Sequence, residues 1–270
     1  MNSNNHNSNL VSVQNIYMSF PKGNGDKEIE VLNNLTMNVK KGEVISILGP
    51  SGCGKTTLIK LIGGLLLSKK GLISVDGLEP AEARNRRTFS FMFQNPVLLP
   101  WLTVHDNVKL PGQVFGDKEI IERASYFIKL VGLSGFEDLY PDQLSGGMKS
   151  RVALARALSF KPKLLLMDEP FGALDALTRS IMQNELLSIL NTSPTTVILV
   201  THSISEAVYV SDRVILLSNR PANIILDLPV ELPVPREQSI QEKTEFLLYQ
   251  KKIKEILFER QLSEFFRINN

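Results

Sequence analysis

The chain has 270 residues, of which 43% are hydrophobic and 21% are charged, a composition typical of a globular protein with a buried core. The net charge of +2 is too small for the clustered basic face of a nucleic-acid-binding domain, so we expect no nucleic-acid partner, although it is compatible with an anionic membrane surface. The single cysteine, Cys53, excludes an intrachain disulfide and favours a reducing compartment.

Residues 1–9 form a polar Asn/Ser tract without the apolar core of a signal peptide, and we expect a disordered leader. Residues 10–20 alternate apolar and polar side chains, which predicts a strand. A glycine-rich turn at 21–27 and a second strand at 31–39 follow, so the chain opens with an antiparallel β region.

The next segment, 43–48, is an apolar run between Gly42 and Gly49, which predicts a buried parallel strand leading into a glycine loop. Strands and helices then alternate, as in a mostly parallel sheet with helices on both faces. We expect helices at 57–67, 175–190 and 203–210 and strands at 72–75, 88–93, 163–167, 196–200, 213–217 and 223–229.

The segment 96–160 is mostly helical in pattern and interrupts this α/β core, which therefore covers 10–95 and 161–230. Helical spacing is clearest for Ile120, Ala124, Phe127, Ile128 and Val131. Prolines then mark a linker, and 238–266 reads as an amphipathic helix, so 231–270 is linker and C-terminal helix. This helix could pack on the domain or assist a dimer. No run of the roughly 18 apolar residues of a spanning helix is present.

A phosphate-binding loop follows the strand at 43–48. Its sequence, Gly49-Pro50-Ser51-Gly52-Cys53-Gly54-Lys55-Thr56 with Thr57 next, fits G-x-x-x-x-G-K-[ST] in full. The glycines let backbone N–H groups point at phosphate oxygens, and the following helix adds its positive N-terminus. We expect Lys55 to reach the β and γ phosphates of ATP and Thr56 to hold Mg²⁺, with the Cys53 side chain pointing away. A chance match in a glycine-rich turn is the alternative, which the flanking strand and helix disfavour.

Two acids end the apolar strand Leu164-Leu165-Leu166-Met167. Asp168 at the strand tip can hold the Mg²⁺ shell, and Glu169 can face the γ-phosphate and polarise a water. The alternative is a solvated pair of acids at a helix start. The phosphate loop upstream favours the functional interpretation.

A further motif precedes a predicted helix at 149–159. Its sequence, Leu144-Ser145-Gly146-Gly147-Met148, resembles the signature motif of ATP-binding-cassette (ABC) ATPases. With the phosphate loop and Asp168-Glu169-Pro170, the resemblance spans almost the whole chain and implies a P-loop NTPase fold. Ser145, Gly146 and Gly147 at a helix N-terminus make a second anion site. In this family two subunits pair head to tail, so that the signature of one closes over the ATP of the other.

Further site residues come from the resemblance. Phe20 matches the aromatic residue against adenine, or is a strand-end core residue; Gln94 matches the residue that touches Mg²⁺ and water. Asp175 matches the loop at the dimer interface, or is a helix N-cap, and His202 matches the switch histidine at the γ-phosphate. Met148 departs from the family's usual Gln and cannot donate its amide hydrogen bond, which we expect to change local contacts without abolishing hydrolysis.

The run Leu98-Leu99-Pro100-Trp101 is similar to importers of the nitrate, sulfonate and taurine group, as are Pro170–Asp175 and Asn219-Arg220-Pro221. Trp101 could form part of an apolar groove for a helix of a membrane partner, or pack in the core of the insert. The alternatives to an importer are an ABC protein acting on DNA or the ribosome, a P-loop kinase, and a protein with an inactive nucleotide site. Each lacks support from the motifs.

The sequence therefore predicts an ATP-hydrolysing subunit of an importer for a small solute, such as nitrate, a sulfonate or taurine. The expected partners are a second copy or a paralogous ATPase subunit, a transmembrane permease and, indirectly, an extracytoplasmic solute-binding protein. The expected location is the cytoplasmic face of the cell membrane.

Overall fold

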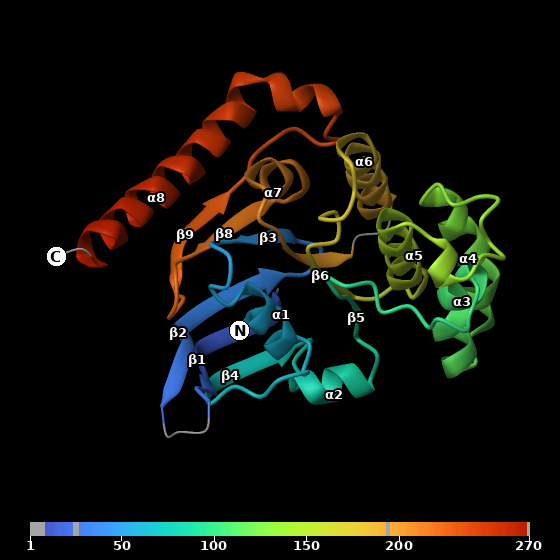
Figure 1. Ribbon diagram of the computed structural model, residues 1–270, viewed down its shortest axis with the longest axis horizontal. Helices are drawn as coiled ribbons and strands as arrows, with labels where there is room; N and C mark the ends of the chain where they lie inside the picture. The colour runs from blue at the N-terminus through green and yellow to red at the C-terminus, as the bar shows by residue number, and fades with distance from the viewer. Residues whose placement is uncertain (1–8, 24–26, 193–194, 269–270) are drawn as a thin grey trace, which may run out of the picture.

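A computed structural model describes residues 9–23, 27–192 and 195–268, with side chains described as far as Glu259. The predicted leader lies outside these residues except for Asn9, which is the first residue of strand β1. Part of the predicted turn, 24–26, also lies outside them. Two sheets and a separate group of helices make up the molecule (Figure 1).

The smaller sheet is antiparallel, with strand order β2-β1-β4. Its strands are β1 (Asn9–Pro21), β2 (Glu28–Lys40) and β4 (Lys70–Val75). Both β1 pairings contain bulges, one of them near Asn15, whose φ is +50°. The predicted antiparallel β region is thus confirmed, and its third strand comes from the segment after the first helix.

The larger sheet has six strands in the order β5-β6-β7-β3-β8-β9. These are β5 (Phe89–Met92), β6 (Leu164–Asp168), β7 (Thr196–Val200), β3 (Val44–Leu48), β8 (Arg213–Leu217) and β9 (Ile224–Pro229). Five are parallel and β9 runs antiparallel to β8. The carboxyl ends of the parallel strands therefore share one edge, where the site is built.

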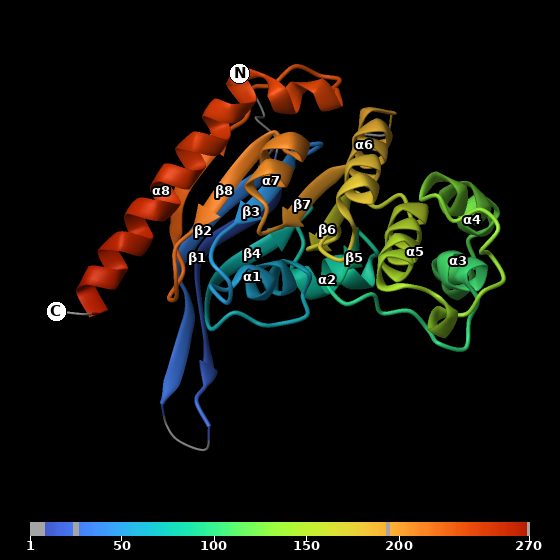
Figure 2. The same cartoon turned by 45° about the horizontal axis from the view of Figure 1, so that its top comes forward.

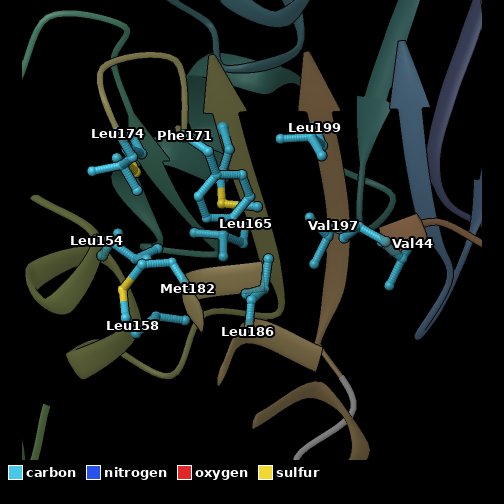
Figure 3. Close-up of a cluster of buried hydrophobic side chains, with 14 of the residues drawn as sticks. Val44, Leu154, Leu158, Leu165, Phe171, Leu174, Met182, Leu186, Val197 and Leu199 are labelled. Atoms are coloured by element: carbon cyan, nitrogen blue, oxygen red, sulfur yellow. The ribbon is translucent and has the colours of Figure 1, made fainter. Parts of the chain in front are cut away.

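Both faces of this sheet are buried, which explains its continuous apolar strands. In β3, Val44 and Leu48 contribute to the core under the helices α6 (Ala176–Thr192) and α7 (Ile204–Val210), while Ile45 and Ile47 contribute to the core around α1 (Lys55–Ile62). Figure 3 shows the first core, where side chains of β3, β6, β7, α5 and α6 meet. Burying each such side chain stabilises the fold by about 1.5–3 kcal/mol.

The helical insert comprises α3 (Val104–Phe115), α4 (Lys118–Leu130), the 3₁₀ turn η1 (Pro141–Gln143) and α5 (Gly146–Ser159). They lie together beside the β5 and β6 side of the sheet (Figures 1 and 2). Thr103 and Asp117 cap α3 and α4 by accepting backbone N–H bonds. The fully buried Asn107 side chain bonds to Leu99, Leu102 and Thr103, which fixes the segment entering α3.

The helices before β5 differ from the prediction at two places. α1 ends at Ile62 rather than 67, because the chain turns at Gly63 and then Gly64, whose φ is +59° and whose Cβ would clash with Pro80. The short helix α2 (Pro80–Asn85) was not expected, since Ala83 is its one buried residue and it carries no apolar period.

The C-terminal region begins with η2 (Gln238–Glu242), breaks at Lys243 and continues as α8 (Thr244–Ile268), where one helix was predicted. The buried Phe246 and Ile253 attach α8 to the core, and α8 contacts α7. The helix then extends past β9 toward the C-terminus (Figure 2). Across the described residues, every helix is too short or too polar to cross a membrane.

Candidate nucleotide site

The phosphate loop joins β3 to α1 at the carboxyl edge of the large sheet. The Lys55 side chain is almost fully buried, and its Nζ donates to the carbonyl oxygens of Gly49 (2.8 Å) and Pro50 (2.9 Å). These two bonds close the loop on itself. They also hold the ammonium group against the start of the loop.

Two glycines of the loop are required by its backbone. Gly52 and Gly54 have φ of +73° and +123°, which disfavour other residues. A Cβ on Gly54 would also lie 2.8 Å from Val31 Cγ1. Gly54 is therefore fixed by both conformation and close packing against β2.

A pocket of about 380 Å³ lies over the loop. Phe20, near the end of β1, lines it together with residues of the loop and with Gln94 and Glu169. The lining residues are Phe20, Val31, Ser51, Gly52, Gly54, Lys55, Thr56, Thr57, Gln94, Glu169 and Arg220. Phe20 is half-buried, since it packs against the core around α1 and also lines the pocket, so its role against adenine stays a prediction.

Arg220 was not predicted as a site residue, although Asn219-Arg220-Pro221 was noted as a branch feature. Its guanidinium lies beside Gly52, since a Cβ on Gly52 would be 3.4 Å from Arg220 Nη2.

The Cys53 side chain is buried behind the loop, and burial raises the pKa of its thiol. Cys53 can therefore offer a nucleotide only its backbone, and Gly49 and Pro50 lie outside the pocket lining.

Two of the three residues predicted to hold a metal are in contact. Thr56 Oγ1 donates to Asp168 Oδ1 at 3.2 Å, joining the start of α1 to the tip of β6. Burial raises the pKa of the Asp168 carboxyl group, and the Thr56 hydrogen bond and nearby lysines oppose that rise. The carboxylate is thus costly to desolvate alone, which is the usual condition of a group that faces a cation.

Glu169 lies at the centre of a polar group with Gln94 and His202, which we term the catalytic edge after the role predicted for it. Its Oε2 accepts from Gln94 Nε2 at 3.1 Å and lies 3.4 Å from His202 Nδ1. Its φ is +49°, a left-handed conformation that costs about 1 kcal/mol in a non-glycine residue, and its N–H donates to Val200 O at 2.9 Å. Two side chains from separate segments, Gln94 and His202, thus converge on one carboxylate.

The signature residues lie elsewhere in the chain. Ser145 caps α5, and its Oγ accepts from Met148 N at 3.2 Å, so Gly146 and Gly147 form the first turn. None of the three signature residues lines the pocket over the phosphate loop. The two predicted anion sites are therefore separate surfaces of one subunit.

Asp175 takes the N-cap geometry that was its alternative interpretation. Its Oδ1 accepts from Thr178 N at 3.0 Å and its Oδ2 from Thr178 Oγ1 at 2.7 Å, and these bonds lower the pKa of its carboxyl group. The side chain is exposed to solvent at the start of α6. An interface role for Asp175 stays a prediction.

The structure contradicts one of the two interpretations of Trp101. Its side chain is 69% exposed, so it does not pack in the core of the insert. An apolar groove of about 410 Å³ does lie between the insert and the core, but neither Trp101 nor Leu99 lines it. Asn107 instead holds Leu99 against the start of α3.

Comparisons with known proteins place this site in a family. The sequence profile described as ABC transporter matches residues 32–172. An uncharacterised ABC transporter ATP-binding protein of Methanocaldococcus jannaschii is 46% identical over 249 residues, covering 92% of this chain and 91% of the relative. The aliphatic sulfonates import ATP-binding protein SsuB of Bacillus cereus is 41% identical over 243 residues, covering 89% and 95%.

Two further similarities extend the comparison. The bicarbonate transport ATP-binding protein CmpC of Synechococcus elongatus is 45% identical over 234 residues, which are 85% of this chain but 35% of CmpC. A solved dimeric ATP-binding cassette in a post-hydrolysis state with ADP and Pi superposes with a TM-score of 0.73 at 30% identity, over 83% of this chain and 100% of that one.

The fold and site define a P-loop ATPase of the cassette type. The chain belongs to the ABC transporter family as an ATP-binding subunit, which confirms the predicted family, and it hydrolyses ATP.

Proposed function

We propose that this chain powers an ABC importer for a small solute, such as nitrate, a sulfonate or taurine, through a separate permease. The observation that carries the proposal is the similarity, over most of the chain, to ATP-binding proteins named for sulfonate import and bicarbonate transport. The Leu98-Leu99-Pro100-Trp101 run adds to it.

The geometry supports a role for each residue at the phosphate loop. Backbone amides of the loop and Lys55 bind the β and γ phosphates, and Phe20 lies against the adenine. Glu169 polarises the attacking water, and Gln94 and His202 orient Glu169 from two sides. The γ-phosphate would lie between Lys55 and this group.

The donor set fits Mg²⁺, which prefers hard oxygen ligands. Thr56 and Asp168 present oxygens 3.2 Å apart, and Gln94 uses its amide nitrogen on Glu169, which leaves its amide oxygen for a cation. When bound, Mg²⁺ would neutralise phosphate charge. Thr56, Asp168 and Gln94 are the residues that would hold it.

A second subunit completes the site in this proposal. The pocket is open above the phosphate loop, and Ser145, Gly146 and Gly147 form a separate anion-binding helix start. A head-to-tail pair, of two copies or of this chain and a paralogue, brings the signature of one subunit to the ATP of the other. The solved cassettes similar to this chain are dimers. Asp175 and its loop would then face the partner.

The groove between insert and core is the proposed permease contact. It is lined mainly by apolar side chains, including Phe91, Phe93 and Val114, with arginines such as Arg156 at its wall. Phe93 immediately precedes Gln94, so a helix seated in the groove lies one residue from the catalytic edge. Burial lowers the pKa of Arg156. Such a groove accepts a short amphipathic helix.

The location follows from these partners. A subunit that binds a permease would act at the cytoplasmic face of the membrane, while an extracytoplasmic solute-binding protein would deliver the solute from the other side. The solute itself would not touch this chain.

The decisive experiment is purification of this chain from its source membranes, identification of the permease and solute-binding protein that accompany it, and assay of ATP hydrolysis by the reconstituted complex with candidate anions. Stimulation by nitrate, a sulfonate, taurine or bicarbonate would support the proposal. Co-purification with ribosomes or nucleic acid instead of a permease would refute it.

A further inference from the structure

A buried acid lies behind the catalytic edge and has no role in the mechanism above. Glu206, on α7, is 5% exposed, and its Oε1 has no hydrogen-bond partner among the described residues. Buried carboxylates are rare unless paired, because leaving water without a partner costs free energy. Packing alone therefore does not explain a buried carboxylate with one unpaired oxygen at this position.

The other contacts of Glu206 connect it to the site. The Thr201 hydroxyl hydrogen-bonds to its carboxyl group, and Thr201 directly precedes His202. The charged groups that face Glu206 are Arg179 of α6, His202, and Glu169 after β6. Glu206 does not line the nucleotide pocket, so it can act only through these neighbours.

Arg179 in turn holds the loop that follows Glu169. Its Nε donates to Phe171 O at 3.3 Å and its Nη2 to Leu174 O at 2.8 Å. The side chains of Phe171 and Leu174 are buried in the core beneath α6, as Figure 3 shows. The loop Phe171–Asp175 is thus fastened from below by apolar side chains and along its backbone by one guanidinium.

We propose that Glu206 is a positioning residue that braces the Thr201–His202 segment against Arg179, so that the histidine and the Phe171–Asp175 loop keep one geometry around Glu169. The carboxylate interacts with Arg179 through charge and with Thr201 through a hydrogen bond. When a partner subunit moves the Phe171–Asp175 loop, the brace transmits that movement to His202. The inference rests on the roles proposed for Glu169 and His202.

The brace needs a negative charge, because attraction to Arg179 is electrostatic. Burial raises the pKa of the Glu206 carboxyl group to about 7, while Thr201, Arg179 and His202 lower it and Glu169 raises it further. Below that pH the acid is neutral and the attraction is lost. Turnover that depends on the brace should therefore rise with pH through this range.

The test compares the full-length chain with Glu206→Gln, which keeps the shape and removes the charge. Steady-state ATP hydrolysis is measured at several ATP concentrations from about pH 6 to 8.5. At the upper end we expect kcat to fall about 10-fold with KM unchanged, and the inflection near neutral pH to disappear. Equal kcat and an unchanged pH profile in Glu206→Gln would overturn the proposal.

Two further variants distinguish loss of the proposed brace from a general loss of activity or stability. Glu43→Gln removes a partly buried carboxylate that pairs with Arg213 far from the site, and it should leave kcat near that of the wild type. Arg179→Gln removes the other end of the brace, and the double variant should lose no more than the worse single variant. Additive losses would show that the two residues act independently, contrary to the proposal.

A third variant separates failure of this inference from failure of the site assignment. Glu169→Gln should abolish turnover if Glu169 has its proposed role. Full activity of Glu169→Gln would refute that role and the brace with it, whereas inactivity of Glu169→Gln beside normal Glu206→Gln would refute the brace alone.

Discussion

Glu169 and Glu206 are two acids in one region whose environments differ. The Glu169 side chain is 21% exposed and has polar partners on two sides, whereas Glu206 is buried with one oxygen unpaired. The polar partners of Glu169 orient its carboxylate, while burial raises the pKa of the Glu206 carboxyl group to about 7. The environment of each acid, rather than its residue type, assigns its role.

Replacing Glu169 by Gln tests the first of these roles. The amide keeps the shape and the contact with Gln94 but cannot accept a proton, so turnover should fall by at least about 100-fold. ATP binding should persist, because the phosphates are held by the loop and Lys55. The variant should accumulate as an ATP-bound dimer, measurable by size-exclusion chromatography with ATP. Hydrolysis at the wild-type rate would contradict the assignment.

The raised pKa of Glu206 also leads to a prediction about the stability of the fold. Its folded pKa of about 7 lies above the usual 4.5, so between these pH values the folded state holds a proton that the unfolded state has lost. The stability that this proton provides is present below about pH 4.5 and falls by about 3 kcal/mol as the pH rises through 7.

Urea unfolding of the wild type and Glu206→Gln, each at about pH 5 and pH 8, measures this effect. The difference in unfolding free energy between the two proteins should shift in favour of Glu206→Gln as the pH rises. If Glu206→Gln is more stable than the wild type at alkaline pH but hydrolyses ATP more slowly, the Glu206 carboxylate serves function at the expense of stability. A pH-independent difference between the two proteins would contradict the assigned pKa.

The elements of the core could be predicted because their sequence periods match their burial. β3 and β6 read as continuous apolar runs, since each buries both faces, and the phosphate loop carries its own local pattern. The groove could not be placed from sequence. Its lining residues come from α2, β5, α3, α5 and the segments beside them, and Trp101, which the sequence analysis singled out, is largely exposed and does not line it.

The linker before α8 gives an element-scale example that sequence reasoning missed. Arg236 is buried, its Nη1 donates to Tyr209 O (2.9 Å) and Ser211 O (2.8 Å), and its Nη2 lies 3.6 Å from Asp212 Oδ1. These contacts attach the linker to the end of α7. In sequence, an arginine between prolines reads as solvated linker.

Replacing Arg236 by Leu should therefore loosen the C-terminal region. Two buried carbonyls lose their donors, and we expect the free energy of unfolding to fall by about 2–3 kcal/mol. Thermal unfolding and limited proteolysis between 231 and 243 measure the change. Lys243→Leu, at an exposed position in the same region, is the matched control and should behave as the wild type. Equal proteolysis of both variants would show that Arg236 does not hold the linker.

At the scale of the whole molecule, one segment connects the two working surfaces. Phe91 and Phe93 stack at 4.4 Å between ring centroids and line the groove, and Gln94 next to them bonds Glu169. We therefore expect a movement of the insert against the core to reach Gln94 and Glu169 through β5. If the proposed permease contact is correct, coupling between ATP hydrolysis and the permease runs through the groove and not through Trp101.

Val114→Glu tests that conclusion. Val114 lines the groove and is 66% exposed, so a carboxylate there should leave the fold intact while opposing an apolar helix. The isolated variant should bind and hydrolyse ATP as the wild type does, and the reconstituted complex should lose most of its solute-stimulated ATPase activity. Val234→Glu makes the same change at a residue of equal exposure outside the groove, and stimulation should survive it. If both variants retain stimulation, the permease contacts another surface of this subunit.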